Sequence, residues 1–159
     1  MKKRTAPDVS IAVLKKFRLI FGAVRQQFRE VEETCGVTGS QLWILKEVSG
    51  SPGIGVSELA GRLAIHQSTC SQLVEKLVTK GFLEKERSQE DQRRVGLQLT
   101  QQAKAALAAA PGPATGVLPD ALAQLPIEAL ETLDGSLADL ITTLKNIDEK
   151  FAEKPLSDL

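Results

Sequence analysis

The sequence predicts a mainly α fold, of the α+β class, in which one short β-hairpin interrupts a run of helices. Several long stretches carry apolar residues every three or four positions, which is the period of an amphipathic helix. Two short stretches, FLEKER and VGLQLT, alternate with period two on either side of SQEDQR and predict an antiparallel hairpin. The chain has 159 residues, of which 42% are hydrophobic, so one domain with a sizeable core and helical extensions is expected.

The first predicted element is a long amphipathic helix over residues 8–33. Its apolar stripe consists of Val13, Leu14, Phe17, Ile20, Phe21, Val24, Phe28 and Val31. At 1.5 Å per residue such a helix is about 39 Å long. A small lobe cannot cover a stripe of that length, so we expect it to be buried across a two-fold axis between two copies of the chain.

Three shorter helices follow. Thr38 and Gln41 have the spacing of a capping box at the start of the helix in TGSQLWILKEV. Ser57 is a good N-cap for the helix in SELAGRLAI, and Gly81 suits the left-handed stop of the helix in HQSTCSQLVEKLVTKG. The last two helices are joined by a tight turn, and the second has Cys70, Leu73, Val74 and Leu77 at inward positions. This spacing predicts a helix-turn-helix, and with the hairpin directly after it the lobe is a winged helix.

The C-terminal third is predicted to be helical with one interruption. Residues 101–110 continue as a helix, but the segment 111–126 contains four prolines and two glycines and should break or kink. A second apolar stripe then consists of Leu130, Leu133, Leu137, Leu140, Leu144, Ile147 and Phe151. We therefore expect an N-terminal dimerisation helix (1–36), a winged helix-turn-helix DNA-binding lobe (37–101) and C-terminal dimerisation helices (102–159), together one compact domain per subunit.

Charge and composition narrow the possible functions. The net charge is zero, yet residues 1–30 carry eight Lys and Arg against two Asp and Glu, and residues 111–159 carry three against nine. The two ends should therefore attract each other, within a chain or between copies. Only 4% of residues are aromatic, which argues against stacking platforms for single-stranded nucleic acid. The start MKKRTAPDVS has no apolar signal core and no stretch is apolar enough to span a membrane, so a cytoplasmic protein without a membrane partner is expected.

The middle of the chain resembles a known family. The stretch STCSQLVEKLVTKGFLEKERSQEDQRRVGLQLT is similar to the recognition helix and wing of the multiple antibiotic resistance regulator (MarR) family, and its wing pattern is filled by Asp91, Arg93, Leu97, Leu99 and Thr100. The resemblance implies a homodimeric transcriptional regulator, a repressor by this reading, that binds a pseudo-palindromic operator in double-stranded DNA. It further implies relief by a small aromatic or phenolic acid, and neither a cofactor nor catalytic residues.

The predicted DNA-binding residues lie on the recognition helix and the wing. They are Gln67, Ser68, Thr69, Ser71, Gln72, Lys76, Arg87, Asp91, Arg93 and Arg94. Gln can pair with adenine and Ser can reach a base or a phosphate, while Arg is favoured in the minor groove. By resemblance, Asp91 orients the Arg93 guanidinium in a bidentate pair, Arg93 enters the groove and Arg94 contacts a phosphate. Lys85 is a weaker phosphate candidate. Alternatively, Asp91 and Arg93 only hold the hairpin on the domain.

Other residues leave alternatives open. The two thiols, Cys35 and Cys70, match no metal-ligand spacing, so no metal site is expected. Cys70 occupies an inward position, whereas Cys35 should be more exposed, which leaves a thiol redox sensor as one alternative function. A winged-helix protein-interaction module without sequence-specific DNA binding is another. Trp43 either packs between lobe and dimer helices or lines a ligand pocket, where Arg18 or Arg25 could meet a carboxylate.

Overall fold

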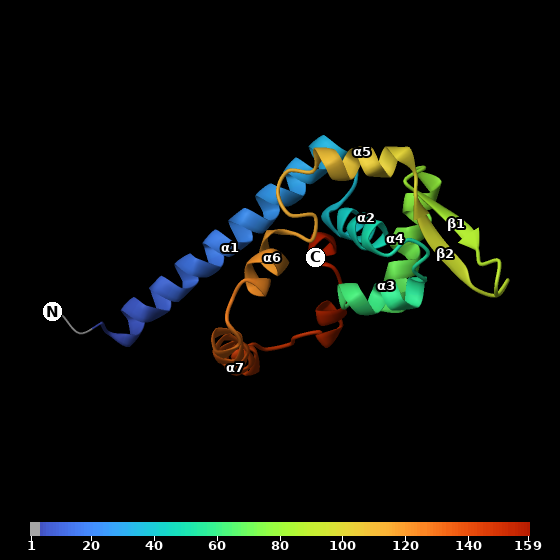
Figure 1. Cartoon of the computed structure of the whole chain (residues 1–159). Coiled ribbons are helices and arrows are strands. Elements are labelled where there is room, and N and C mark those ends of the chain that lie inside the picture. Colours follow the sequence, from blue (N-terminus) through green and yellow to red (C-terminus); the bar gives the residue numbers. More distant parts are fainter. Residues whose placement is uncertain (1–3) are drawn as a thin grey trace.

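The computed structural model describes residues 4–159, and its first helix is the long one that the sequence predicts. Helix α1 spans Ala6–Cys35. It begins at Thr5, whose side chain forms a capping box with Asp8, and ends at Gly36, whose φ of 70° is left-handed. Figure 1 shows that only its C-terminal half lies against the rest of the molecule, while its N-terminal half projects away.

Three helices form the lobe: α2 (Gly39–Gly50), α3 (Val56–Leu63) and α4 (Gln67–Thr79). Thr38 and Gln41 form the expected capping box of α2. Helix α3 begins before the predicted N-cap Ser57, with Gly55 as its N-cap. The reason is that the carbonyl of Ile54 accepts a hydrogen bond from the amide of Leu97 at 3.0 Å, so the chain enters α3 directly after this strand-like contact.

The hairpin packs on the lobe as expected. Strands β1 (Leu83–Arg87) and β2 (Val95–Leu99) are antiparallel, with Leu83 opposite Leu99 and Arg87 opposite Val95. Gly81, with a φ of 82°, ends the preceding helical segment. The amide of Gly53 also donates to the carbonyl of Leu97 at 2.8 Å, which joins the segment before α3 to the hairpin. The result is a winged helix-turn-helix within a mainly α fold.

The C-terminal third contains α5 (Gln101–Ala109), α6 (Val117–Ala123) and α7 (Ile127–Thr143), followed by the 3-10 turns η1 (Glu149–Glu153) and η2 (Leu156–Asp158). The proline-rich segment is interrupted, as predicted. The second apolar stripe was predicted too long: α7 ends at Thr143, Leu144 is extended, and Asn146 adopts a left-handed φ of 59°. Ile147 and Phe151 therefore lie outside the helix.

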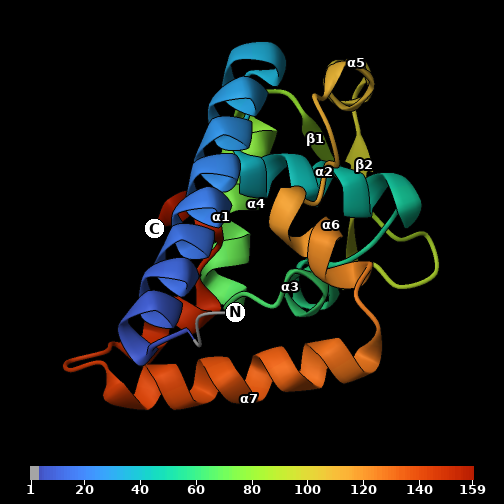
Figure 2. The ribbon, with the colours of Figure 1, turned by 90° about the vertical axis from the view of Figure 1, so that its left-hand side faces the viewer.

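One core lies inside the lobe, where α2, α3, α4 and the hairpin meet the end of α1 and α5. Its fully buried large side chains include Leu42, Ile44, Leu45, Leu59, Leu77, Leu83 and Leu97. Only Val24, Gln27, Val31 and Cys35 of α1 are buried, and α7 has no buried residue. Figure 2 shows α7 crossing the far end of the molecule from the hairpin.

Two apolar surfaces consequently remain uncovered in the single chain. The exposed residues of the first half of α1 include Val9, Ile11, Val13, Leu14, Ile20 and Phe21. Those of α7 and the segment after it include Ile127, Leu133, Leu140, Ile141, Leu144 and Ile147. We name these the α1 face and the α7 face. None of the helices within residues 4–159 is both long and apolar enough to cross a lipid bilayer.

Candidate nucleic-acid interface

Helix α4 is anchored by one face and presents the other to solvent. Its inward residues Cys70, Leu73, Val74 and Leu77 are all buried, as the sequence predicted. Of the predicted DNA-binding residues on this helix, Gln67, Ser68, Gln72 and Lys76 are exposed, and Thr69 and Ser71 are half-buried. The buried face fixes the rotation of the helix, because turning it about its axis would expose the apolar side chains. The outer face is therefore polar and held in one orientation.

The first turn of α4 is capped by His66, its N-cap residue. Its Nδ1 accepts a hydrogen bond from the amide of Ser68 at 3.1 Å and lies 2.7 Å from the Ser68 hydroxyl. A helix N-terminus has amides without partners inside the helix, and a capping side chain satisfies one of them. The hydrogen bond between His66 and the Ser68 hydroxyl could not be predicted from the sequence, because imidazole is an uncommon capping group. Ser68 would have to release or share this bond to reach DNA.

The tip of the wing, residues 88–94, is a closed turn. The Ser88 hydroxyl accepts from the amides of Glu90 and Asp91, and the Ser88 amide donates to the carbonyl of Arg94 at 2.9 Å. The amide of Arg94 donates to the carbonyl of Asp91 at 2.9 Å. These local bonds hold the tip without any apolar contact.

Asp91 organises this turn, but not through the contact predicted from sequence. Its Oδ1 accepts from the main-chain amide of Arg93 at 3.0 Å, and its Oδ2 lies 3.9 Å from Nε of Arg94. An Asp side chain in a tight turn commonly binds the amide two residues later, which leaves the guanidinium at that position outside the contact. The predicted bidentate pair between Asp91 and Arg93 is therefore wrong in detail. The carboxylate is paired with Arg94 instead.

The two basic residues of the wing tip consequently differ in whether a carboxylate lies beside them: Arg94 has Asp91 as a partner. Arg93 and Arg94 are both exposed, and within residues 4–159 Arg93 has no carboxylate within 4.0 Å. On the first strand, Lys85 pairs with Glu75 of α4, which ties the wing to the recognition helix and makes Lys85 a poor phosphate contact. Arg87, at the end of β1, remains exposed.

The cysteines are buried and separate. Cys35 is only 7% exposed, and its thiol donates to the carbonyl of Ala106 at 3.4 Å, so the expectation that it is more exposed is wrong. The end of α1 is covered by α5, which sequence periodicity alone did not reveal. Burial raises the pKa of the Cys35 thiol, and it raises the pKa of Cys70 to about 11. A reactive thiol needs a low pKa and access, and neither cysteine has them.

Both cysteines should therefore be inert in the folded protein. At pH 8, Ellman's reagent should react with neither thiol in the native state and with both in denaturant. The protonated Cys70 thiol contributes stability fully below its ordinary pKa of 9.0, and this contribution is lost as the pH rises through about 11. Unfolding monitored by circular dichroism between pH 8 and 11 should show this loss, and Cys70→Ala should reduce it. Rapid reaction of one native thiol would restore the redox-sensor alternative.

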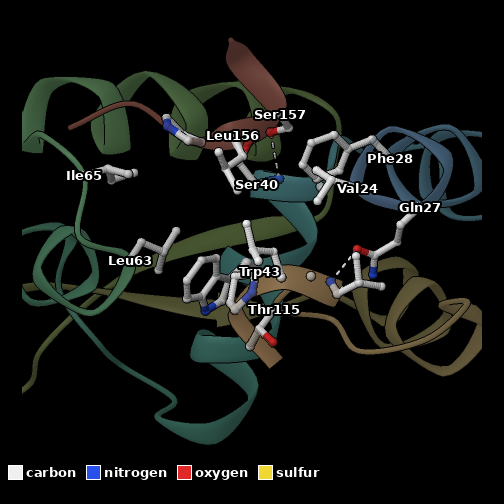
Figure 3. Close-up of a pocket in the computed structure, with 16 residues that line it drawn as sticks. Val24, Gln27, Phe28, Ser40, Trp43, Leu63, Ile65, Thr115, Leu156 and Ser157 are labelled. Atoms are coloured by element: carbon white, nitrogen blue, oxygen red, sulfur yellow. Dashed lines mark hydrogen bonds between the residues drawn. The ribbon is translucent and has the colours of Figure 1, made fainter. Parts of the chain in front are cut away.

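An apolar cavity of about 50 Å³ lies between α1, the start of α2 and α6. Figure 3 shows Trp43 and Thr115 on one side of it and Phe28, Ser40 and Leu156 on another. Trp43 packs against the core of the lobe and also lines this cavity. Among residues 4–159 no charged side chain lines it, and the lining includes neither Arg18 nor Arg25. Arg25 lines an adjoining open groove between α1 and the C-terminal residues, which shares Leu156 and Ser157 with the cavity.

No metal site is indicated, because within residues 4–159 no group of three or more His, Cys, Asp and Glu side chains could hold an ion.

Comparison with known proteins agrees with this geometry. The model of the MarR family matches residues 36–94. A probable transcriptional regulator from Pseudomonas aeruginosa is 25% identical, with a TM-score of 0.51 over 77% of this chain and 93% of that one. A MarR family transcription regulator is 21% identical, with a TM-score of 0.56 over 86% and 89% of the two chains. None of the curated proteins matches the sequence.

A further similar structure contains nucleic acid. It is a mutant of MarR from E. coli complexed with operator DNA, 21% identical, with a TM-score of 0.51 over 81% of this chain and 95% of that one. The part of the chain that the MarR family model matches, residues 36–94, is thus the part that forms the winged helix-turn-helix lobe.

Proposed function

We propose that this protein is a homodimeric, sequence-specific DNA-binding regulator, and that it represses transcription. The observation that carries the proposal is the anchored α4, whose buried face fixes an outer face of uncharged polar side chains and Lys76. Side chains of this kind on the first turns of a recognition helix suit base edges and phosphates in the major groove. Gln67, Ser68, Thr69, Ser71 and Gln72 are the proposed contacts there.

The wing supplies the second proposed contact. Arg93 is exposed and has no carboxylate partner among the residues that the structure describes, while Asp91 accepts from its amide and holds the turn. A narrow minor groove has a concentrated negative potential that attracts Arg. Arg93 is therefore the proposed groove contact, Arg94 and Arg87 are phosphate contacts, and Asp91 is a positioning residue.

The uncovered apolar surfaces support the homodimer. The α1 face and the α7 face are each too large to leave in water, and α1 is basic where α7 is acidic. The α1 cations include Lys15, Lys16 and Arg18, and the α7 anions include Glu128, Glu131 and Asp134. Pairing α1 of one copy with α7 of the other would bury both faces. A two-fold dimer could then set two recognition helices about 34 Å apart on a pseudo-palindromic operator.

A small ligand could relieve this repression by favouring a different separation of the two lobes. The cavity beside Trp43 is the proposed location. The described part of the chain gives its lining apolar walls and a few neutral polar groups, and no cation for a carboxylate. A neutral phenol therefore suits it better than an ionised aromatic acid.

The proposal predicts tight, salt-dependent binding to DNA. Labelled duplexes from the DNA beside this protein's own coding region should bind in fluorescence anisotropy and resist excess random competitor. The log of the affinity should fall steeply with the log of the salt concentration, because phosphate contacts release counterions. Binding that is no tighter than to random DNA, with a shallow salt slope, would favour the protein-interaction alternative.

A further inference from the structure

The chain after α7 returns to the lobe and docks there. We name residues 153–158 the docking segment. The carbonyl of Glu153 accepts from the amide of His66 at 3.1 Å, and the Ser157 hydroxyl accepts from the amide of Ser40 at 3.1 Å. The Ser40 hydroxyl donates in turn to Asp158 at 3.4 Å. Figure 3 shows the contact between Ser40 and Ser157, which brings together parts of the chain that are far apart in sequence.

These bonds satisfy donors at the starts of two helices. The amide of Ser40 lies in the first turn of α2, where no carbonyl inside the helix can accept from it. The amide of His66 belongs to the N-cap residue of α4. The docking segment therefore supplies acceptors to α2 and to the recognition helix at the same time, which is specific docking and not chance proximity.

The same segment forms one wall of the apolar cavity. Pro155, Leu156 and Ser157 line it opposite Trp43. The fit is close at this end, because a Cβ on Gly39 would lie 2.6 Å from the Phe28 ring and 3.6 Å from Ser157. An apolar side chain from the chain itself thus covers space that an apolar ligand would use.

The docking is weak enough to be reversible. Leu156 remains 43% exposed although it lines the cavity, and the other contacts are a few part-buried hydrogen bonds. A partly exposed apolar side chain stabilises less than a fully buried one, and a typical hydrogen bond contributes only a small net free energy. Segments held in this way open locally far more often than the core does.

We propose that the docking segment is a built-in occupant of this cleft, and that neutral apolar molecules bind by displacing it. If only a small fraction of the protein is in the open state that binds the ligand, the apparent affinity is lower than the affinity of the open state by that fraction. Since Glu153 also bonds the N-cap residue of α4, a molecule that displaces the segment removes a contact at the start of the recognition helix. This competition does not depend on whether the protein binds DNA.

The test compares two variants of the full chain with the parent. In L156S/S157G the cavity side chain and the hydroxyl that bonds Ser40 are removed. In Phe151→Ser a similarly exposed apolar side chain, 53% against 43% for Leu156, is removed from the same region, but it does not line the cavity. The probe is N-phenyl-1-naphthylamine, a neutral apolar fluorophore. Trp43 is the only tryptophan, so its emission reports the cavity wall directly.

The double variant should bind the probe about tenfold more tightly than the parent, and its Trp43 emission should shift to longer wavelength. Phe151→Ser should behave like the parent in both measurements. Unchanged melting temperatures would exclude general loosening. Equal probe affinity and unchanged Trp43 emission in the double variant would overturn the proposal, and so would an equal gain in Phe151→Ser. A failure of DNA binding would leave these results unaffected.

Discussion

Arg93→Ala should weaken operator binding by about tenfold to a hundredfold while the melting temperature stays the same. The guanidinium is exposed and has no carboxylate partner within the described residues, so its removal costs the folded chain almost nothing. Its charge is fully available to the minor groove, where each subunit of a dimer would lose one contact. Anisotropy with the operator and thermal unfolding by circular dichroism measure the two quantities separately.

Three further variants sharpen this prediction. Lys104→Ala removes a cation from the exposed surface of α5, away from the wing, and should leave operator affinity unchanged. Asp91→Asn keeps an oxygen that can accept from the Arg93 amide, whereas Asp91→Ala removes it. Asp91→Ala should therefore lower affinity more than Asp91→Asn does. If Arg93→Ala retained full affinity, or if Lys104→Ala lost as much, the wing would not be a DNA contact.

The lobe could be predicted from sequence because its signals are local. The inward residues of α4 recur with helical period, and the flanking stretches of the hairpin alternate over five residues each. Caps such as Thr38 need only a side chain and an amide three residues away. Where a long-range contact decided a boundary, prediction failed: the start of α3 depends on the bond between Ile54 and Leu97, which are far apart in the chain.

The C-terminal region was harder to predict for the same reason. The apolar spacing continues through Leu144, Ile147 and Phe151, yet the helix stops at Thr143 because the chain turns back toward the lobe. That return depends on acceptors meeting Ser40 and His66, and nothing in the local sequence marks it. The burial of Cys35 under α5 was missed in the same way.

The DNA-binding residues of the wing stay a prediction, but the predicted contact of Asp91 was wrong. Sequence identified Asp91 and the two following arginines, because the wing pattern fixes their positions. It could not tell which arginine pairs with the carboxylate, since residues two and three positions away are both within reach. In the folded turn the main-chain amide of Arg93 donates to the Asp91 carboxylate, and the side chain that pairs with this carboxylate is that of Arg94.

Gly96→Ala should destabilise the protein and displace the wing. A Cβ at this position would lie 2.7 Å from the carbonyl oxygen of Gly53 and 2.8 Å from its Cα. Both are backbone atoms that cannot rotate away, so β2 must move off the segment before α3. That movement strains the bonds that join Leu97 to Gly53 and Ile54 and disturbs the buried Leu97 side chain. Overpacking of this kind costs about 1–3 kcal/mol.

In a chain of this size each kcal/mol lowers the melting temperature by about 2–4 °C, so a fall of about 5 °C is expected. Gly61→Ala is the matched control, because its Cβ meets nothing within 4 Å and the residue lies inside α3. Alanine is the better helix former by about 1 kcal/mol, so this variant should melt at a higher temperature than the parent. Opposite shifts from the same substitution would exclude a general effect of adding a methyl group. An unchanged or raised melting temperature in Gly96→Ala would mean that the wing can move freely on the lobe. Its position could not then fix Arg93 relative to the recognition helix.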